Sequence, residues 1–357
     1  MNDMAPKHCL VPIKVWMIIA MVILLAVAVI SNWSQMIKAF GIIFQKDGIK
    51  WLILTLILPV QLLNSFVRGN INYLYLFAKG EKVSRMRMTR IAIETNFVDH
   101  IAIFSGVAGM AFYVWRLSSN KVKASNSVCA QILNYILVFA STTLLLIASV
   151  IHLIVDNGNQ MVIIAGISLI VLITILLTAV VFITKNYKKS LRMSFWLAKI
   201  INAAASVVTL GKKKKIIETT VLQGFFDSVN ENLVDISINK KALVKPFCWS
   251  ILASVMDAGL IYITFASLGV LLNPIVLFVA SSFSSNACIF SPIPGGIGVY
   301  EWWMILLLST AGLSSDLSIA GILLARTLLF IVYIVLGFPF LLMTIRKYGK
   351  PPSKEKN

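Results

Sequence analysis

The residues that could carry chemistry are a few ionisable side chains inside long apolar segments. They are Glu94, Asp99, His100, His152, Asp257, Glu301 and Arg326. A charged group at the centre of a bilayer costs about 3 kcal/mol or more, so such groups are usually paired or face a cavity. No Ser-His-Asp order, zinc-protease motif, nucleophile elbow or nucleotide-binding fingerprint accompanies them in a usable context. They are candidates for binding or moving a ligand, and we assign no catalytic residue.

Cysteine and histidine spacing indicates neither a metal site nor a disulfide framework. The cysteines, Cys9, Cys129, Cys248 and Cys288, lie far apart, and the three histidines have no partner at metal-ligand spacing. We expect no metal and no other cofactor.

Residues 291–301 read SPIPGGIGVYE and interrupt an apolar region. The interruption consists of Pro292, Pro294, Gly295, Gly296 and Gly298. Proline breaks a helix and glycine lets backbone approach closely, so N–H groups are freed before a helix that should start near Val299. Freed N–H groups at a helix start favour an anion, and a lipid phosphate is the natural candidate. The alternative is a packing kink without a ligand.

Composition defines the broad class of protein. Of 357 residues, 59% are hydrophobic and 13% are charged, which predicts a polytopic, all-α membrane protein with one membrane domain over 1–357. The net charge of +18 comes from Lys and Arg between apolar runs, so the expected partners are membrane lipids and not nucleic acid.

Hydropathy predicts six full spans and two interrupted regions. The spans are 15–32, 50–67, 129–154, 161–184, 247–268 and 318–345, and the interrupted regions are 91–115 and 274–311. The first span could also be a signal peptide, but we prefer an uncleaved helix because the orientation of later spans depends on it.

Basic residues orient the chain. Lys and Arg are concentrated in 68–90, 116–128, 185–245 and the tail, and none occurs in 156–160, 268–273 or 312–316. The positive-inside rule places the first group in the cytoplasm, with both termini, and predicts a multi-pass plasma-membrane protein. Segment 185–245 is either amphipathic helices lying on the inner leaflet or a solvated loop with ordinary helices, and 346–357 is a cytoplasmic tail.

The two interrupted regions predict an inverted repeat. Region 91–115 is too short for two spans and should be a re-entrant hairpin from the cytoplasm, with Ser105, Gly106 and Gly109 at its turn. Region 274–311 is either two short spans or a hairpin from outside. The halves 1–184 and 246–345 would then have opposite orientation, an architecture typical of transporters.

Four acidic residues and one arginine have expected positions. Glu94 and Asp99 lie in the first limb of the cytoplasmic hairpin, where they could bind a cationic headgroup or relay protons, although Glu94 could also be hydrated at the interface. Asp257 is at the middle of its span and should point inward. Glu301 and Arg326 each lie ten residues from the same external connection, about 15 Å deep, so we predict that they pair.

The C-terminal region carries a specific motif, Pro-x-Pro-Gly-Gly-x-Gly-x-x-Glu, followed by a glycine-containing loop and an Arg-containing span. The motif maps onto Pro292, Pro294, Gly295, Gly296, Gly298, Glu301, Gly312, Arg326 and Gly337. This region resembles the lysylphosphatidylglycerol synthase transmembrane, or flippase-like, family. The stretch ETNFVDHIAIFSGVAGMAFYVWRL resembles the family's first-half motif, except at Phe104 and Val107, where many members have Pro and Gly.

The resemblance implies a domain that translocates lipid between leaflets. In the multiple peptide resistance factor such a domain flips aminoacylated phosphatidylglycerol made by a fused aminoacyltransferase domain, which we expect this chain to lack. The expected cargo is an anionic or aminoacylated phospholipid or a polyprenyl-linked lipid. One alternative is a subunit or remnant of a lipid-modifying enzyme, such as a phosphatidylglycerol lysyltransferase, acting with a separate soluble partner. Another is a structural membrane protein without a substrate.

Overall fold

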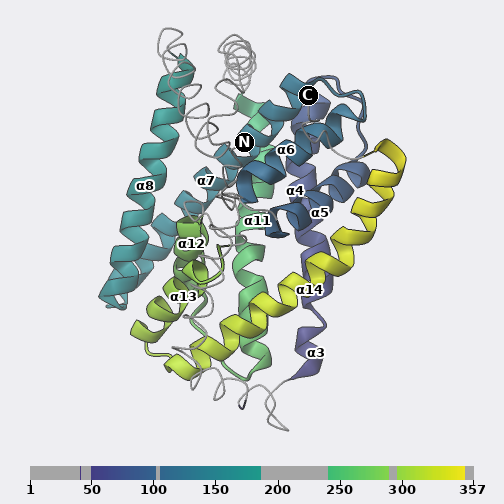
Figure 1. The fold of residues 1–357 in the computed structure, drawn as a ribbon. Helices are drawn as coiled ribbons and strands as arrows, with labels where there is room; N and C mark the ends of the chain where they lie inside the picture. Colours follow the sequence, from purple (N-terminus) through teal and green to yellow (C-terminus); the bar gives the residue numbers. More distant parts are fainter. Residues whose placement is uncertain (1–40, 42–49, 102–104, 186–239, 289–295, 350–357) are drawn as a thin grey trace, which may run out of the picture.

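The computed structural model describes residues 41, 50–101, 105–185, 240–288 and 296–349, and every regular element within them is a helix (Figure 1). Five of these helices are long and apolar enough to cross a membrane. They are α3 and α4 together (Trp51–Leu54, Ile57–Ala78), α7 (Ala124–Val155), α8 (Gln160–Lys185), α11 (Lys240–Ser267) and α14 (Ser315–Tyr348). The chain is a polytopic helical membrane protein, as expected. The predicted first span, 15–32, and most of segment 185–245 lie outside the described residues.

Four shorter helices form two pairs, and each helix is too short to span a bilayer by itself. They are α5 (Arg85–Ile101) with α6 (Ser105–Ser118), and α12 (Pro274–Cys288) with α13 (Val299–Thr310). At about 1.5 Å per residue each is about 18 to 26 Å long, less than the roughly 30 Å hydrocarbon core. Region 274–311 is therefore a pair of short helices and not two full spans.

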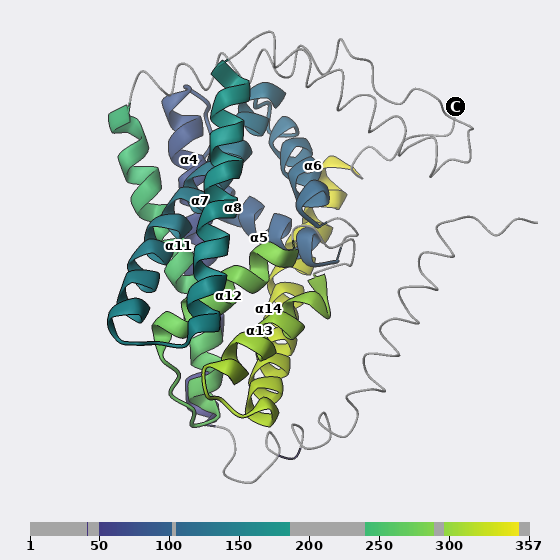
Figure 2. The same cartoon turned by 90° about the vertical axis from the view of Figure 1, so that its left-hand side faces the viewer.

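The two pairs approach from opposite ends of the bundle. In Figures 1 and 2, α5 and α6 lie toward the end where α4 finishes, and α12 and α13 lie toward the end where α11 finishes. Each half is thus a spanning helix, a short-helix pair and a second spanning helix: α4, α5–α6, α7 in one, and α11, α12–α13, α14 in the other.

Each short-helix pair packs into the apolar core of its own half. In the first half, residues such as Ile71, Met88, Tyr113 and Cys129 join α4, α5, α6 and α7 in one buried cluster. In the second, a cluster from α8 and α11 to α14 includes Phe265, Leu277, Met304 and Ile322. Burial of this apolar surface fixes the pairs against the spans that flank them.

Large apolar side chains also remain on the outer surface of the bundle. On α7 and α8, Leu144, Ile151, Ile164 and Ile175 are each at least half exposed. A helix that is apolar on its outer face is matched to lipid, because the hydrocarbon core contacts that face.

Two boundaries differ from the predictions. Helix α4 continues to Ala78, eleven residues beyond the predicted end of its span, so Arg68 is inside a helix and not in a connection. Ser105, Gly106 and Gly109, predicted at a turn, lie in α6. Residues 102–104, which connect α5 to α6, lie outside the described residues. Glycine is also used inside membrane helices for close packing, which a turn-based interpretation does not distinguish.

Candidate functional site

A polar cavity of about 710 Å³ lies at the centre of the bundle, between the two short-helix pairs. Its lining comes from α4, α5, α6, α7, α11, α12 and α13. The polar lining residues include Arg68, Asn72, Thr95, Asn96, Asp99, His100, Gln131, Asn134, Thr142, Ser254, Asp257, Ser281, Ser282, Ser285 and Asn286. Such a group of side chains inside an apolar bundle is costly unless it faces water or a polar ligand.

The charged centre of the cavity is an ion pair between Arg68 on α4 and Asp257 on α11. Asn64, one turn before Arg68, donates its Nδ2 hydrogen to Asp257 Oδ1 over 2.7 Å and accepts from Arg68 Nε over 3.2 Å. The Asp257 side chain is 46% exposed, so one charged group of the pair is accessible from the cavity. Asp257 points inward, as predicted, and its arginine partner is held by the same asparagine.

Asp99 and His100 lie at the inner end of α5 and line the same cavity. A Cβ at Gly109 would come within 2.0 Å of Asp99 Oδ1, so a larger residue at this position of α6 would displace the carboxylate from its present place. His100 Nδ1 lies 2.7 Å from the Asn96 carbonyl oxygen, and its ring stacks on Tyr333 of α14 with 4.0 Å between centroids. The short-helix pair therefore presents its ionisable groups to the cavity from its inner end.

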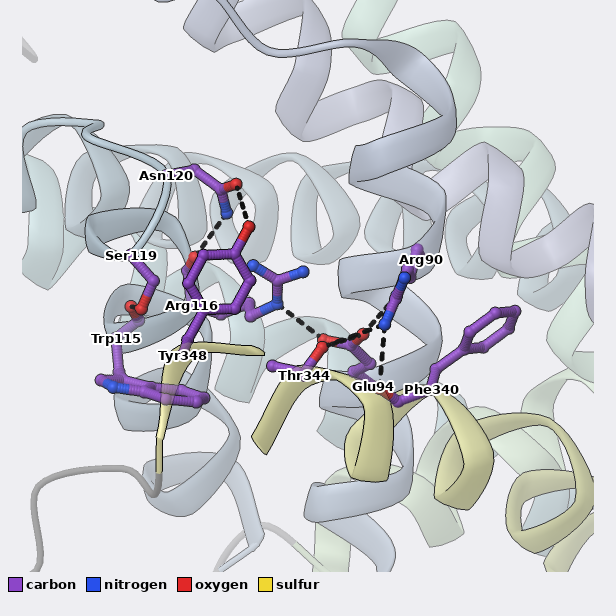
Figure 3. A network of polar contacts seen from close by, with 9 residues as sticks. All are labelled: Arg90, Glu94, Trp115, Arg116, Ser119, Asn120, Phe340, Thr344 and Tyr348. Carbon is purple, nitrogen blue, oxygen red and sulfur yellow. Dashed lines mark hydrogen bonds and ion pairs between the residues drawn. The ribbon is translucent and has the colours of Figure 1, made fainter. Parts of the chain in front are cut away.

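Glu94 does not line the cavity and is not hydrated. It is fully buried (0% exposed) and accepts hydrogen bonds from Arg90 Nε at 2.7 Å, Arg116 Nε at 2.9 Å and Thr344 Oγ1 at 2.8 Å (Figure 3). The alternative of a hydrated interfacial Glu94 is wrong, because two arginines and a hydroxyl from α5, α6 and α14 replace its water. Headgroup binding or proton relay by Glu94 stays a prediction.

Glu301 and Arg326 form an ion pair, with Arg326 Nε 2.7 Å from Glu301 Oε1. The pair joins the start of α13 to α14, which is the contact that the depth argument predicted. The guanidinium also lies over the ring of Tyr300, 4.4 Å from its centroid, and Tyr300 lines the cavity. The ion pair is thus next to the cavity wall, while its part in binding lipid stays a prediction.

The backbone at the start of α13 corrects the proposed phosphate site. Gly298 has φ of 88°, in the left-handed region, and its N–H donates to Glu301 Oε2 over 2.6 Å. The carboxylate of Glu301 already supplies the negative charge that this helix start favours, so the Gly298 N–H is not free for phosphate. Pro292, Pro294 and Gly295 lie outside the described residues.

Gly296 contributes to the cavity wall in another way. Its φ is 63°, and an added Cβ would lie 2.5 Å from the sulfur of Cys288. Both the backbone conformation and the close approach of Cys288 require glycine here. Gly296 and Cys288 together form part of the cavity lining.

Several cavity residues were not predicted from the sequence. The charge pattern places Arg68 in a connection between spans. Arg68 is instead the twelfth residue of α4, and an arginine inside an apolar helix indicates a buried acidic or polar partner. The amides Gln131 and Asn134 and the hydroxyls Thr142 and Ser254 are uncharged, so a search for ionisable residues passes over them. Ser254 Oγ lies 3.2 Å from Thr142 Oγ1 and joins α11 to α7.

The fold and this cavity define a class: a polytopic helical membrane protein with a polar chamber between two broken, oppositely directed helix pairs. Among the described residues no group of three or more His, Cys, Asp or Glu side chains is placed to hold a metal ion.

The comparison with known proteins identifies the family within this class. The protein-family model described as "Lysylphosphatidylglycerol synthase TM region" matches residues 10–337, and the chain belongs to this family. It is also 26% identical over 275 residues to a UPF0104 membrane protein of Pyrococcus horikoshii, covering 77% of this chain and 79% of the relative. The resemblance drawn from the C-terminal motif is confirmed, and membership indicates a role connected with membrane lipids.

Proposed function

We propose that the protein moves a lipid headgroup between the two leaflets through the central cavity. The observation that supports this most directly is the polar chamber of about 710 Å³ between the two short-helix pairs. Its volume is within the roughly 300 to 1,000 Å³ of small-ligand sites, which is enough for a phospholipid headgroup while the acyl chains stay in the bilayer.

The charges in the cavity suit a phosphate-containing headgroup. Arg68 can pair with the phosphate, and Asp257, released from part of its contact with Arg68, can pair with an ammonium group such as that of an aminoacylated or zwitterionic lipid. Asp99 offers a second carboxylate near the inner end of α5. Amide and hydroxyl side chains on α7, α11 and α12 replace the water that a headgroup leaves behind.

The opposite directions of the two pairs support a two-sided mechanism. Inverted units with broken elements near the midplane are the arrangement by which many transporters open to each side in turn. We place the end that carries the basic residues in the cytoplasm of a plasma-membrane protein, with both termini on that side. Reporter fusions at both termini and within residues 156–160 test this orientation.

A reconstitution experiment tests the transport step. Liposomes that contain the protein and a trace of fluorescent phosphatidylglycerol are treated with dithionite, which bleaches only the outer leaflet. We expect the rate of leaflet exchange to fall at least about tenfold in Arg68→Gln, because this variant removes the charge that pairs with the phosphate. With a labelled aminoacylated lipid as cargo, Asp257→Asn should lower the rate by a similar factor, because its carboxylate pairs with the ammonium group. Asp156→Asn, an exposed site at the end of α7, is the control and should keep the wild-type rate.

Two results would count against lipid movement. Exchange equal to that of protein-free liposomes would exclude phosphatidylglycerol as cargo, and the same assay with an aminoacylated lipid would then decide whether any phospholipid moves. Transfer of an aminoacyl group to phosphatidylglycerol, after addition of a separate soluble partner, would favour the lipid-modifying alternative.

A further inference from the structure

A second cavity, of about 270 Å³, lies at the basic end of the bundle. Its lining residues are Met86, Arg87, Arg90, Arg116, Lys347 and Tyr348, and none of them lines the central cavity. They come from the first turns of α5, the last turn of α6 and the last residues of α14, so three elements meet there. We refer to these six residues as the basic pocket.

Positive charge dominates this pocket. Four of its six residues are cationic, and the nearest carboxylate described is Glu94, which Arg90 and Arg116 share (Figure 3). One carboxylate among four cations leaves an excess of positive charge. Such an excess is stabilised by an anion from outside the chain.

Arg116 provides a donor that the protein does not use. The residue is 3% exposed, and its Nε binds Glu94, while its Nη1 is buried and makes no hydrogen bond within the described residues. The ring of Tyr348 covers the guanidinium, with Cζ 4.8 Å from the centroid. A buried guanidinium nitrogen without an acceptor is costly, so an acceptor from a ligand would satisfy it.

The start of α5 adds to the same potential. Its first turn contains the pocket residue Arg87 and no acidic residue. Cations are unfavourable at a helix N-terminus, because the helix dipole is already positive there. A bound anion would relieve this repulsion through its charge, while the Arg87 N–H already donates to Ser84 Oγ over 3.4 Å.

We propose that the basic pocket binds a phosphate group, carried either by the headgroup of an anionic phospholipid or by a small water-soluble phosphate. The guanidinium groups of Arg87 and Arg116 suit phosphate oxygens, which they can bind in pairs, and Lys347 adds a point charge. The pocket lies at the end of the spanning helix α14, and Met86 and Tyr348 offer apolar contact to the rest of a headgroup. The ligand would connect α5 and α6 to the end of α14.

Two matched double variants test this site. Arg87→Gln with Lys347→Gln removes two cations from the pocket. Arg85→Gln with Arg346→Gln removes two cations from the same ends of α5 and α14, but neither residue lines the pocket. All four side chains are exposed. Both proteins are checked for monodispersity and helical circular dichroism, and single variants at 347 and 346 serve if a double variant fails to fold.

The two sources of phosphate are separated by two measurements. Native mass spectrometry of the full chain in detergent with phosphatidylglycerol reports bound lipid. Thermal unfolding in phosphatidylcholine nanodiscs, with sodium phosphate against sodium chloride at equal ionic strength, reports a soluble phosphate. Retention of phosphatidylglycerol by the wild type and the control, with at least about tenfold weaker retention by the pocket variant, supports a lipid headgroup. A phosphate-induced rise in unfolding temperature, lost only in the pocket variant, supports a soluble phosphate. Equal behaviour of the pocket and control variants in both measurements overturns the proposal.

Discussion

At the scale of single residues, several described charges inside the bundle form ion pairs between helices. Arg68 pairs with Asp257, Glu301 with Arg326, and Glu94 with two arginines. These pairs join helices that are far apart in the sequence. Because each isolated charge would be costly in lipid, their mutual neutralisation is a condition for the helices to insert together.

Glu94 should be the acidic residue whose charge matters most for stability. In Glu94→Gln the buried guanidinium of Arg116 loses its anion, and we expect a loss of about 3 kcal/mol or more in the free energy of unfolding. Thermal or denaturant unfolding of detergent-purified protein measures the change. Asp156→Asn, where the carboxylate is exposed beside His152, should change stability by less than about 0.5 kcal/mol. Equal effects of the two variants would contradict a structural role for the buried carboxylate.

Glu301 should couple to Arg326 more strongly than two independent sites do. We expect Glu301→Gln and Arg326→Gln each to destabilise the protein, and the double variant to cost about 1 to 3 kcal/mol less than the sum. A double-mutant cycle from unfolding midpoints measures this difference. Strictly additive effects would show that the 2.7 Å contact contributes nothing measurable.

At the scale of helices, the short pairs are held by close approaches that glycine permits. At Gly337 of α14 an added Cβ would lie 2.3 Å from Cβ of Phe97 on α5, and at Gly109 it would meet Asp99. Contacts of this kind bring backbones together in membranes, where packing replaces the hydrophobic effect as the driving force.

Gly337→Ala should therefore separate α14 from α5. Since the clashing atom is a Cβ next to backbone, it cannot rotate away, and we expect a loss of about 1 to 3 kcal/mol in stability. Gly259→Ala on α11 is the matched control, because no heavy atom lies within 4 Å of its added Cβ. Alanine there should be neutral or stabilise the helix by up to about 1 kcal/mol. A tolerated Gly337→Ala would mean that the two helices can shift without cost.

Most of the described spanning helices could be predicted from the sequence, because the hydropathy and charge of a segment determine locally whether it enters the membrane. Five spans and the helix start at Val299 follow from these two patterns alone. The end of α4 could not be predicted, because the charge of Arg68 is neutralised by Asp257, 189 positions later. The sequence predicts that the Gly298 N–H binds phosphate, which is wrong because the Glu301 carboxylate accepts this N–H in addition to pairing with Arg326. The pairing of Glu301 with Arg326 could be predicted, because both residues lie equally far along the chain from one external connection and therefore at a similar depth.

At the scale of the whole molecule, the helices have an apolar exterior, buried apolar clusters and one cavity lined by polar residues. Apolar side chains on α7 and α8 face outward, and the clusters of each half hold the helices together. Hydroxyl, amide and charged groups gather around the cavity.

Native cysteines can report whether water reaches the cavity. Cys288 lines it, and Cys129 is fully buried in the core of the first half. In proteins that keep one of the two and have serine or alanine at the other positions, we expect a small water-soluble methanethiosulfonate to modify Cys288 much faster than Cys129. Mass spectrometry of the intact protein measures both rates. Equal, negligible rates would indicate a cavity closed to water on both sides.

Helix α14 has a geometry that joins the two ends of the molecule. Its 34 residues would extend about 51 Å, far more than the bilayer core, and in Figure 1 it crosses the bundle obliquely. In its first half Arg326 binds α13, and near its end Thr344 binds Glu94 of α5. Because α14 contacts one helix of each short pair, any change in its position would alter the contacts of both pairs at once.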